Sequence, residues 1–585
     1  MWSRPVQPIR PRRAPRWAAL LAGASLLAAA CGGDSGVTQG ASEPLDDAGS
    51  PTVTADPDPS PDSGSGGPAV DDDPVGPDGT EPPPTRRPGD PTDPEDPDSP
   101  GGPDDPVEAG EPDAASGAGD LPDPAERDPR RFEPDPLEWE PMGNGAEATM
   151  LAVPIDYTEP DGDTMDLFVA RRPADDPDSR IGSLLVNPGG PGFGGTVFAL
   201  FADQVYDDEL LRRFDIVGWD PRGTGESEPA VDCIDDWDEY VGALDSSDDP
   251  ETESLELAQQ FAAECGRRSD GIVQHVGTNN SARDMDVIRR ALGEDTISYF
   301  GFSYGSALGA TWATLFPDTV RAAVLDGASD PEAERLESSL QQLAGFEASL
   351  GTFLERCGDA PSCPLHGGGD AGAEFDQLMA ELDDDPIPSR PGRPDVGRSI
   401  ATTAVIQAMY SEETWPRLER ALGDAVAGDG SGLLELYDRY YQREPGGTYG
   451  DELEAFQVIS CADRPDRPTP DELAEEVELF AEVAPRLAPA DAEVSYFCTF
   501  MPPALDPRVT VTADGAGPVV VIGTTGDPAT PFESTRAMAE ALDDGRFVIV
   551  EADQHTGYGV NSCVVELVNR YLVDLDAPAD GTECE

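Results

Sequence analysis

Short apolar runs alternate with helix-spaced stretches from residue 146 to the C-terminus. Runs of this kind are typical of strands buried on both faces of a mostly parallel sheet. Their alternation with helical stretches predicts an α/β fold with helices covering both faces of that sheet. The predicted strands are an opening pair, Ala146–Val153 and Thr164–Arg171, followed by Leu184–Asn187, Phe214–Trp219, Ile297–Phe302, Ala322–Asp326, Val519–Gly523 and Phe547–Glu551.

One helix between these strands has signals at both ends. Its apolar residues recur on one face, Ser281 and Asp284 have the spacing of a capping box, and Gly293 follows as a stop. The pattern predicts a helix over Ser281–Leu292.

A long interval without a good strand separates Asp326 from Val519. A helical block inserted between two strands of a parallel sheet lies over their carboxyl ends, where open α/β folds keep their sites. We therefore expect a helical lid over residues 332–510, between a first core part, 131–331, and a second, 511–585. The expected lid helices are Pro331–Leu354, Ala371–Leu382, Ile400–Ala427, Leu433–Gln442 and Asp471–Leu487, the last opened by a capping box at Thr469 and Glu472.

The first 130 residues differ in composition from the rest. Residues 1–30 contain five Arg and no acidic residue, and their apolar run is too short to span a membrane, which predicts a secretory signal peptide. Small residues precede Cys31, as in bacterial lipoprotein signals in which this Cys is acylated; the alternative is an ordinary signal peptide with a chance Cys. Residues 31–130 have almost no large apolar residue and predict a disordered, acidic, Pro-rich tether. We expect an exported protein anchored by lipid to the outer face of a bacterial cell membrane, with later release left open.

The formal net charge of −79 argues against nucleic acid and anionic lipid surfaces as partners, so membrane contact is expected through the lipid anchor alone. The chain has no lysine, which excludes Schiff-base and Ser-Lys chemistry. Its three histidines argue against a multi-histidine metal centre. We expect neither a metal nor a cofactor.

Eight cysteines follow Cys31, and an even number in an exported protein indicates disulfides rather than metal ligands. Their spacings fall within single sections of the fold, which favours sequential pairing. The expected disulfides are Cys233–Cys265, Cys357–Cys363, Cys461–Cys498 and Cys563–Cys584.

A candidate nucleophile lies in the sequence Gly301-Phe-Ser-Tyr-Gly305, directly after a predicted strand and before a stretch of small residues. Glycines at these positions allow a tight strand-turn-helix corner that presents the Ser303 hydroxyl to a substrate. The same corner leaves the Tyr304 N–H free to face a substrate oxygen, whereas a simple glycine-rich turn is the alternative.

A serine nucleophile needs a base, and the base needs an acid that fixes its tautomer. His555 follows the last predicted strand in a loop, whereas His275 and His366 fall at positions typical of structural or surface residues. Asp527 follows the strand Val519–Gly523, and Thr530 with Pro531 offers a cap for the next helix without it. Asp553 is the rival acid, but it is close to His555 in sequence. Ser303, Asp527 and His555 are the expected triad.

The oxyanion of acyl transfer needs a second backbone donor beside Tyr304. The loop Pro188–Gly195, at the carboxyl end of a predicted strand, has five glycines that allow the backbone to approach a reacting carbonyl. We expect Gly190 to supply this N–H; a flexible surface loop is the alternative.

The chain resembles secreted bacterial tripeptidyl aminopeptidases, relatives of the prolyl aminopeptidases in the α/β-hydrolase superfamily. The resemblance extends from about residue 137 to the C-terminus and rests on several motifs in the same order: Asn187–Gly192, Asp215–Ser227, Ala282–Asp286, Gly301–Gly305 and Gly526–Pro531. It implies an α/β-hydrolase fold with a helical lid, and hydrolysis of peptides near a free N-terminus by Ser303, Asp527 and His555. Relatives often have a cysteine pair near the start of the catalytic body, and this chain has none around Trp139–Leu151.

Recognition of a peptide N-terminus requires carboxylates at a fixed distance from the nucleophile. Asp463, two residues after Cys461, and Glu226 are the candidates, although Asp463 can instead pair with Arg464 and either charge can simply be solvated. Two other functions remain open: a carboxylesterase or lipase with the same triad, and a non-catalytic envelope lipoprotein that uses the fold for binding. The oligomeric state is left open.

Overall fold

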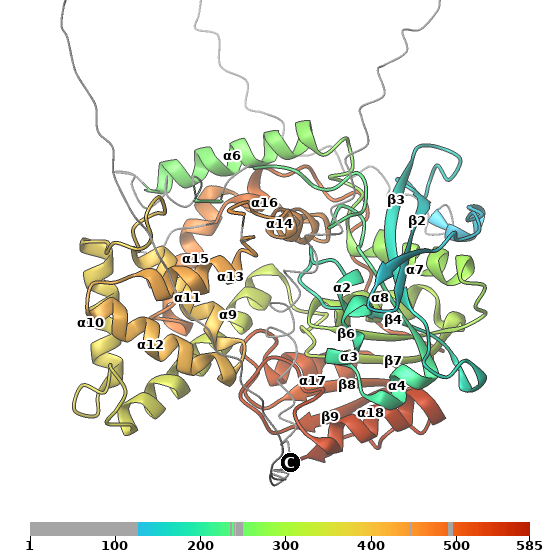
Figure 1. Ribbon diagram of the computed structural model, residues 1–585. Coiled ribbons are helices and arrows are strands. Elements are labelled where there is room, and N and C mark those ends of the chain that lie inside the picture. Colours follow the sequence, from blue (N-terminus) through green and yellow to red (C-terminus); the bar gives the residue numbers. More distant parts are fainter. Residues whose placement is uncertain (1–126, 235–236, 239, 241–249, 445, 490–494) are drawn as a thin grey trace, which may run out of the picture. The chain divides into compact units, whose positions relative to one another are not determined.

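The computed structural model describes residues 127–585 apart from 235–236, 239, 241–249, 445 and 490–494 (Figure 1). The signal peptide expected over residues 1–30, the acylation site Cys31 and the tether up to residue 126 lie outside the described residues. The last four residues of the expected tether belong to the folded body instead. Arg127 is buried and contacts the Leu505 carbonyl oxygen at 3.0 Å, and a short helix, η2, follows at Pro129–Arg131. The predicted tether ends four residues too late, because amino-acid composition contains no information about such long-range polar contacts.

The core of the described chain is a ten-stranded sheet with the order β1-β2-β3-β5-β4-β6-β7-β8-β9-β10. Strands β1, β2, β3 and β5 pair antiparallel in succession, and every pair from β5 to β10 is parallel. The strands are β1 Glu140–Gly143, β2 Ala146–Pro154, β3 Thr164–Arg172, β4 Gly182–Asn187, β5 Phe214–Trp219, β6 Ile297–Phe302, β7 Val320–Asp326, β8 Val519–Thr524, β9 Gly545–Val550 and β10 Thr582–Cys584.

All eight predicted strands are present, and their ends differ from the predicted ends by no more than two residues. The prediction missed β1 and β10. Both are short, lie at the two edges of the sheet and contain charged residues, so neither has the apolar run of a buried strand.

Helices cover both faces of the sheet, because successive side chains of a strand point to opposite sides. In β6, Tyr299 packs with the apolar residues of one face, and Phe300 packs with those of the other. The Tyr299 face is covered by α7 Thr278–Ala291, α8 Tyr304–Leu315 and α17 Phe532–Ala541. The Phe300 face is covered by α2 Thr196–Leu200, α3 Ala202–Val205, α4 Asp208–Arg213 and α18 Ser562–Asp574.

The start of α7 was predicted wrongly. The helix begins at Thr278, three residues before the predicted cap, and Ser281 is buried within it. The cap comes from a distant residue, since the Thr278 N–H donates to Asp463 Oδ1 at 2.6 Å. A long-range cap leaves no local sequence signal. The predicted stop is present, with Gly293 at φ +76 just after the helix.

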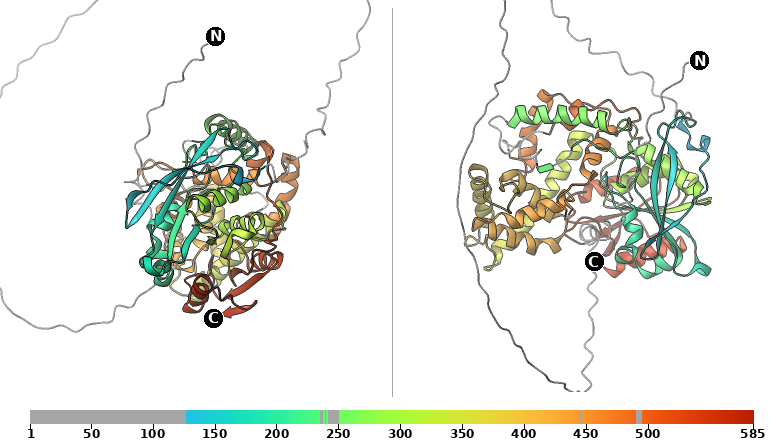
Figure 2. Two further views of the ribbon diagram at one scale, coloured as in Figure 1. Left: turned by 90° about the vertical axis from the view of Figure 1, so that its right-hand side faces the viewer. Right: turned by 45° about the horizontal axis from the view of Figure 1, so that its top comes forward.

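A helical block lies between β7 and β8 in the chain, where the lid is expected. Its helices α9 to α13 share an apolar core of their own, and the right-hand view of Figure 2 shows these yellow and orange helices gathered beside the strands. The block comprises α9 Arg335–Asp359, α10 Ala371–Asp384, α11 Arg398–Met409, α12 Trp415–Val426, α13 Ser431–Tyr440, α14 Glu452–Ala462, α15 Pro470–Val483 and α16 Phe497–Phe500. A further helix, α6 Pro250–Arg268, precedes α7; short 3-10 helices are η3 Pro177–Ser179, η4 Pro317–Thr319 and η5 Glu412–Thr414.

The single helix predicted over residues 400–427 is wrong, because the chain forms α11 and α12 with η5 between them. Ser411 caps η5 through its hydroxyl, which accepts the Glu413 N–H at 3.3 Å. The Thr414 hydroxyl donates to the Ala408 carbonyl oxygen at 2.5 Å, and a proline follows at the start of α12. The capping box at Thr469 and Glu472 is present at the start of α15, as predicted.

The structure contains four disulfides, Cys233–Cys265, Cys357–Cys363, Cys461–Cys498 and Cys563–Cys584, which are the four expected pairs. The third joins the end of α14 to α16, and the fourth joins α18 to the edge strand β10. None of the helices in the described part of the chain has the length and apolar character needed to cross a bilayer.

Candidate active site

Ser303 occupies the sharp corner between β6 and α8, with φ 54 and ψ −125. This conformation is strained for a residue with a side chain and holds the hydroxyl clear of the sheet. The glycines on either side make the corner possible: a Cβ on Gly301 would lie 2.3 Å from the Gly305 carbonyl oxygen. The backbone is held by the Ser303 N–H, which donates to the Asp326 carbonyl oxygen at 2.8 Å.

His555 and Asp527 form a buried pair beside this corner. His555 Nδ1 lies 2.9 Å from Asp527 Oδ1 and 3.0 Å from Oδ2, and both side chains are almost fully buried. The Asp527 carboxylate also accepts the N–H groups of Ala529 and Thr530 at 2.9 and 2.8 Å. His555 Nε2 is buried without a hydrogen-bond partner among the described residues. The acid therefore fixes one ring nitrogen and leaves the other available as a base.

Thr530 is a residue of this site that the sequence reasoning assigned elsewhere. It does not cap α17, whose N-cap is Pro531 and has no side-chain cap. Instead its hydroxyl donates to Asp527 Oδ2 at 3.0 Å and lies 3.3 Å from His555 Nδ1. A Thr that is three residues after the acid was the available signal, but it equally matched a helix cap.

Asp326, at the end of β7, connects the serine corner to the histidine loop. Besides accepting the Ser303 N–H through its backbone, it accepts the N–H groups of Gly557 and Tyr558 through its carboxylate, each at 2.7 Å. The next residue, Gly327, packs so closely on the histidine ring that a Cβ there would lie 3.1 Å from His555 Cε1. The sequence analysis did not single out Asp326, which looks like an ordinary strand end.

The charges around the histidine favour its protonated form. Burial alone lowers the pKa of His555, but the attraction and hydrogen bond of Asp527, with a further contribution from Asp326, raise that pKa above its ordinary value. Burial raises the pKa of Asp326 to about 7, against the opposing effect of its two N–H donors. The backbone N–H of His555 donates to the Tyr410 carbonyl oxygen at 2.9 Å, so the helical block also contacts the loop that carries the histidine.

The glycine loop after β4 lies directly against the nucleophile. A Cβ on Gly189 would lie 2.8 Å from Ser303 Cβ and 3.2 Å from the Tyr304 nitrogen. The Gly189 N–H is engaged by Asn187 Oδ1 at 2.9 Å. Within the described part of the chain, the N–H groups of Gly190 and Tyr304 donate no hydrogen bond. The expected oxyanion donors are therefore both available.

Asp463 is not a free carboxylate. Its two oxygens accept the Thr278 N–H at 2.6 Å and the Thr278 hydroxyl at 2.5 Å, so the carboxylate serves as the cap of α7. It does not pair with Arg464 within ion-pair distance among the described residues. The Thr278 hydroxyl in turn hydrogen-bonds to the Tyr304 hydroxyl.

Glu226 belongs to a group of carboxylates near the glycine loop, which we call the acidic group: Asp220, Glu226, Asp451 and Glu452. The Glu226 N–H donates to Asp220 Oδ2 at 3.0 Å. A Cβ on Gly194 would lie 2.5 Å from Asp220 Oδ1, and one on Gly192 would lie 2.2 Å from the Glu452 carbonyl oxygen. The start of α14 and Asp220 thus both contact the loop that reaches Ser303.

Burial and the neighbouring carboxylates disfavour the charged forms of two members of the acidic group, Asp220 and Asp451. Burial is the main cause that raises the pKa of Asp220 to about 6, and Glu226 adds to it. The pKa of Asp451 is also raised, first by burial and then by Glu452, Glu454 and Asp220.

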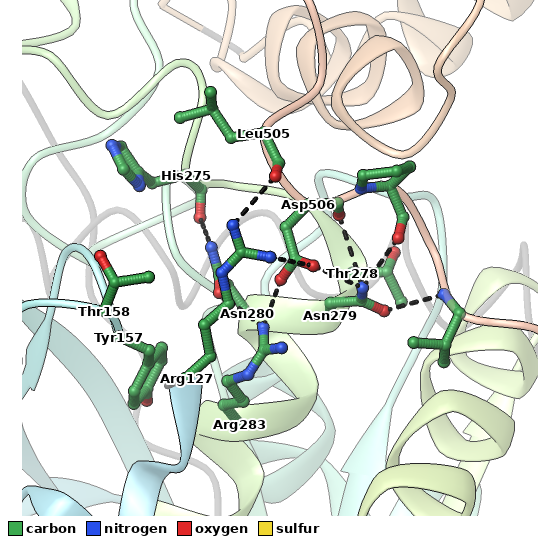
Figure 3. A network of polar contacts seen from close by, with 12 residues as sticks. Arg127, Tyr157, Thr158, His275, Thr278, Asn279, Asn280, Arg283, Leu505 and Asp506 are labelled. Carbon is green, nitrogen blue, oxygen red and sulfur yellow. Dashed lines mark hydrogen bonds and ion pairs between the residues drawn. The ribbon is translucent and has the colours of Figure 1, made fainter. Parts of the chain in front are cut away.

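The remaining candidates lie apart from the site. Asp553 forms an ion pair with Arg356 at 2.6 Å and does not contact the histidine. In Figure 3 the His275 side chain points away from the polar contacts around it, and burial lowers its pKa. His366 lies in a turn that follows the Cys357–Cys363 disulfide. The described residues include no cluster of His, Cys, Asp and Glu able to hold a metal.

Comparison with known proteins agrees with this architecture. Residues 182–379 match the family model for the alpha/beta hydrolase fold, and residues 488–584 match the model for TAP-like proteins. Serine protease Hip1 of Mycobacterium tuberculosis is 35% identical over 479 residues, which cover 77% of this chain and 91% of that protein. The chain belongs to this family of α/β-hydrolases. As a member it is a serine hydrolase, and Ser303 lies at the nucleophile corner of the fold.

Two other members differ in the activity that their names give. Carboxylesterase B of M. tuberculosis is 35% identical over 460 residues, covering 75% of this chain and 86% of that protein. Tripeptidyl aminopeptidase of Streptomyces lividans is 28% identical over 454 residues, covering 74% and 82%. Family membership therefore does not choose between ester and peptide substrates.

Proposed function

We propose that the chain is an exported serine peptidase that cleaves peptides near a free N-terminus. The observation that carries the peptide assignment is the acidic group beside the loop that contacts Ser303. A hydrolase of neutral esters has no use for several half-buried carboxylates at this place, whereas a peptide ammonium would neutralise them.

The catalytic step follows from the arrangement of the site. His555 Nε2 takes the proton of the Ser303 hydroxyl as the oxygen attacks the scissile carbonyl, while Asp527 holds Nδ1–H and stabilises the imidazolium. The N–H groups of Gly190 and Tyr304 stabilise the oxyanion. His555 then gives the proton to the leaving amine, and a water molecule activated by the same histidine hydrolyses the acyl-enzyme. The catalytic groups in these steps come from the chain, and water is the second substrate.

The substrate N-terminus is assigned to the acidic group rather than to Asp463. Burial raises the pKa of Asp463 as well, but its two oxygens are occupied by Thr278. The Asp220 oxygens accept Thr196 and the Glu226 N–H, so the member of the acidic group that carries the assignment is Asp451. Burial and the neighbouring carboxylates Glu452, Glu454 and Asp220 raise the pKa of Asp451. A bound ammonium would lower that pKa and gain charge-assisted hydrogen bonds. Glu226 keeps the role expected from the sequence, now as one of four carboxylates.

Labelling with a fluorophosphonate tests the nucleophile. The wild type should be labelled and the Ser303→Ala variant should not, while the matched variant Ser306→Ala, at a buried serine of the next helical turn, should keep its labelling. An unlabelled wild type would overturn the enzyme assignment and favour a binding lipoprotein.

Three substrates separate peptidase from esterase: a tripeptide anilide, its N-acetylated form and a short acyl ester. The proposal requires that acetylation lower kcat/KM by at least about tenfold, because it removes the ammonium. The second candidate, a carboxylesterase, is favoured by the relative of that name. It predicts rapid ester cleavage and no effect of acetylation.

Export and lipid anchoring are proposed from Cys31 and its preceding signal. The four disulfides support folding in an oxidising compartment. Mass spectrometry of the protein from a bacterial host should find a diacylated Cys31 at the N-terminus. The same protein should partition into the detergent phase of a two-phase extraction. The Cys31→Ser variant should lose both, and an unmodified Cys31 within an intact chain would contradict the anchor.

A further inference from the structure

Two arginines near Tyr304 form no ion pair with a described carboxylate, although Asp463 and Asp466 lie near enough to attract them. Arg464 lies two residues after the end of α14, and Arg508 lies in the segment before β8; both are partly buried. Among the described residues, neither guanidinium has a carboxylate oxygen within 4.0 Å or donates a hydrogen bond. Unpaired charge of this kind is unexpected in a chain with 117 acidic residues, where an arginine such as Arg393 pairs with two carboxylates at once.

The carboxylates nearest to the two arginines are committed elsewhere. Asp463 caps α7 through Thr278, as described above. Asp466 accepts Arg335 at 3.0 Å. Asp506 accepts Arg127 at 2.6 Å and Arg283 at 2.5 Å. A counter-ion for the arginine pair would therefore have to come from outside the described residues.

The segment that carries Arg508 is held by contacts of Asn279 and Asp506, which are labelled in Figure 3. Asn279, at the start of α7, accepts the Val509 N–H at 3.2 Å and donates to the Pro507 carbonyl oxygen at 2.9 Å. The Asp506 carboxylate, two residues before Arg508, accepts the side-chain NH2 of Asn279 at 3.2 Å and the Arg283 guanidinium at 2.5 Å. Both partners lie in the first turns of α7. These contacts fix the backbone from which the Arg508 side chain extends, so a ligand that binds there need not order this segment.

The pair lies close to the residue that follows the nucleophile. The Arg508 N–H donates to the Asp463 carbonyl oxygen at 3.1 Å, and the Asp463 side chain contacts Thr278, which contacts the Tyr304 hydroxyl. Arg508 is also near enough to Tyr304 to lower the pKa of its hydroxyl, which burial and Asp463 raise. A ligand on the arginine pair would thus be close to the side chain of the residue that follows Ser303.

Burial and repulsion both act against the charge of Arg464. Burial first, and then the neighbouring Arg508, lower its pKa below the ordinary value, against the opposing attraction of Asp466 and Asp463. An anion between the two guanidinium groups would relieve both effects and accept paired N–H donors.

We propose that Arg464 and Arg508 bind a carboxylate of the substrate. The inference rests on the proposed peptidase function and adds a second recognition point to it. The two points lie at opposite ends of α14: Asp451 and Glu452 of the acidic group at its start, and Arg464 just past its end. Eleven residues make α14 about 16 Å long at 1.5 Å per residue. An extended peptide of about four to five residues spans the same length. The substrate class is therefore short peptides with a free N-terminus and a carboxylate near the other end.

Two sources of that carboxylate are separated by a matched set of short peptides. The set has four peptides: tetra-alanine with a free C-terminus, tetra-alanine amide, and two amides whose last residue is Asp or Asn. Each peptide is incubated with the full exported chain, and its products are quantified by mass spectrometry. A C-terminal site predicts that the wild type cleaves the free acid at least about tenfold faster than the amide, as expected for a charge-assisted pair. A side-chain site predicts instead a preference for the Asp amide over the Asn amide.

The variants Arg464→Gln and Arg508→Gln should each reduce the preferred rate by about tenfold and leave the plain amide within about twofold of the wild type. Arg420→Gln, at an exposed arginine of α12, is the control and should change neither rate. Equal losses on all peptides would indicate a structural role and overturn the proposal, as would a wild type that cleaves every peptide without regard to a carboxylate. Failure of the peptidase function itself would look different, since no peptide would then be cleaved.

Discussion

Replacement of Asp326 tests how the proposed catalytic histidine is held. Its carboxylate accepts the N–H groups of Gly557 and Tyr558, each at 2.7 Å, and these residues follow His555 by two and three positions. Asp326→Asn keeps the size of the side chain but exchanges one oxygen for an NH2 group. That group can only donate, so one of the two backbone N–H groups would face another donor instead of an acceptor.

The magnitude of the effect follows from this loss. A buried N–H left without an acceptor costs about 1–3 kcal/mol. If the loop moves to avoid the cost, the barrier to reaction rises by a similar amount, and one factor of ten in rate corresponds to about 1.36 kcal/mol. We therefore expect kcat/KM of Asp326→Asn to fall by about five- to 150-fold at the optimal pH.

The pH profile distinguishes positioning of His555 from a general loss of stability. The negative charge of Asp326 helps to raise the pKa of His555, so the neutral Asn variant should have a lower histidine pKa. Because the base acts in its neutral form, the acidic limb of the kcat/KM profile should move to lower pH. The wild-type limb reflects two interacting groups, since Asp326 itself has a pKa of about 7, whereas the limb of the variant should reflect one.

The assay is anilide hydrolysis between about pH 5 and pH 9, which brackets the histidine titration. Asp553→Asn is the matched control: it removes a carboxylate two residues before His555, but that carboxylate pairs with Arg356 at the surface. The control should keep both the rate and the acidic limb of the wild type. An Asp326→Asn profile that is lower in rate but unshifted on its acidic side would refute the electrostatic part of the reasoning.

Three further predictions concern the loop, a buried ion pair and the helical block. Gly189→Ala should reduce kcat at least about tenfold, because its Cβ would lie 2.8 Å from Ser303 Cβ and its φ is +105. Arg222→Met should lower the free energy of unfolding in urea by about 3–5 kcal/mol, since it leaves Asp284 charged and fully buried, and adding Asp284→Leu should recover part of that loss. Burial raises the pKa of Glu454 to about 8 from an ordinary 4.5, so its contribution to stability is full below about pH 4.5 and disappears as the pH rises through about 8. The melting temperature of Glu454→Gln should therefore fall less than that of the wild type between those pH values.

Each of these predictions has its own control. Gly143→Ala introduces a Cβ at an equally unusual φ of +124 with nothing within 4 Å, so it should leave kcat unchanged. For the ion pair, equal destabilisation by the single and double variants would contradict the desolvation argument. For Glu454, melting temperatures of wild type and variant that change in parallel with pH would show that the pKa of this carboxyl does not differ between the folded and unfolded states.

Much of the fold and of the proposed triad could be predicted from the sequence, because both rest on local patterns. Buried strands such as Ile297–Phe302 are short, mostly apolar runs rich in aromatic or β-branched residues, and the serine corner requires glycines at fixed offsets. His555 and Asp527 could be named because chain order in a parallel sheet decides which loops meet at its carboxyl edge.

The parts that were missed depend on contacts between residues far apart in the chain. The cap of α7 comes from Asp463, 185 residues away, so sequence reasoning placed the helix start too late and left Asp463 as a spare carboxylate. Thr530 was misassigned for a different reason: a Thr before a Pro matches a helix cap, and only the fold turns its hydroxyl toward Asp527. A local pattern indicates the roles that a residue can take, whereas its contacts in the fold decide which role it has.

The proposed substrate recognition was the least predictable property because it depends on α14, whose placement has no sequence signal. The start of α14 lies against Gly192, which has no side chain and therefore allows backbone to approach backbone, and its end is fixed to α7 through Asp463 and Thr278. These two contacts place a carboxylate cluster and an arginine pair at a separation that the length of the helix decides. If both groups bind substrate, a change that tilts α14 should alter affinity for the two ends of a peptide together, whereas substitutions within either group should alter one end alone. Measuring KM for peptides that lack the ammonium, the carboxylate or both would separate these cases. The losses of binding free energy add when the two sites act independently, and they do not add when α14 couples the sites.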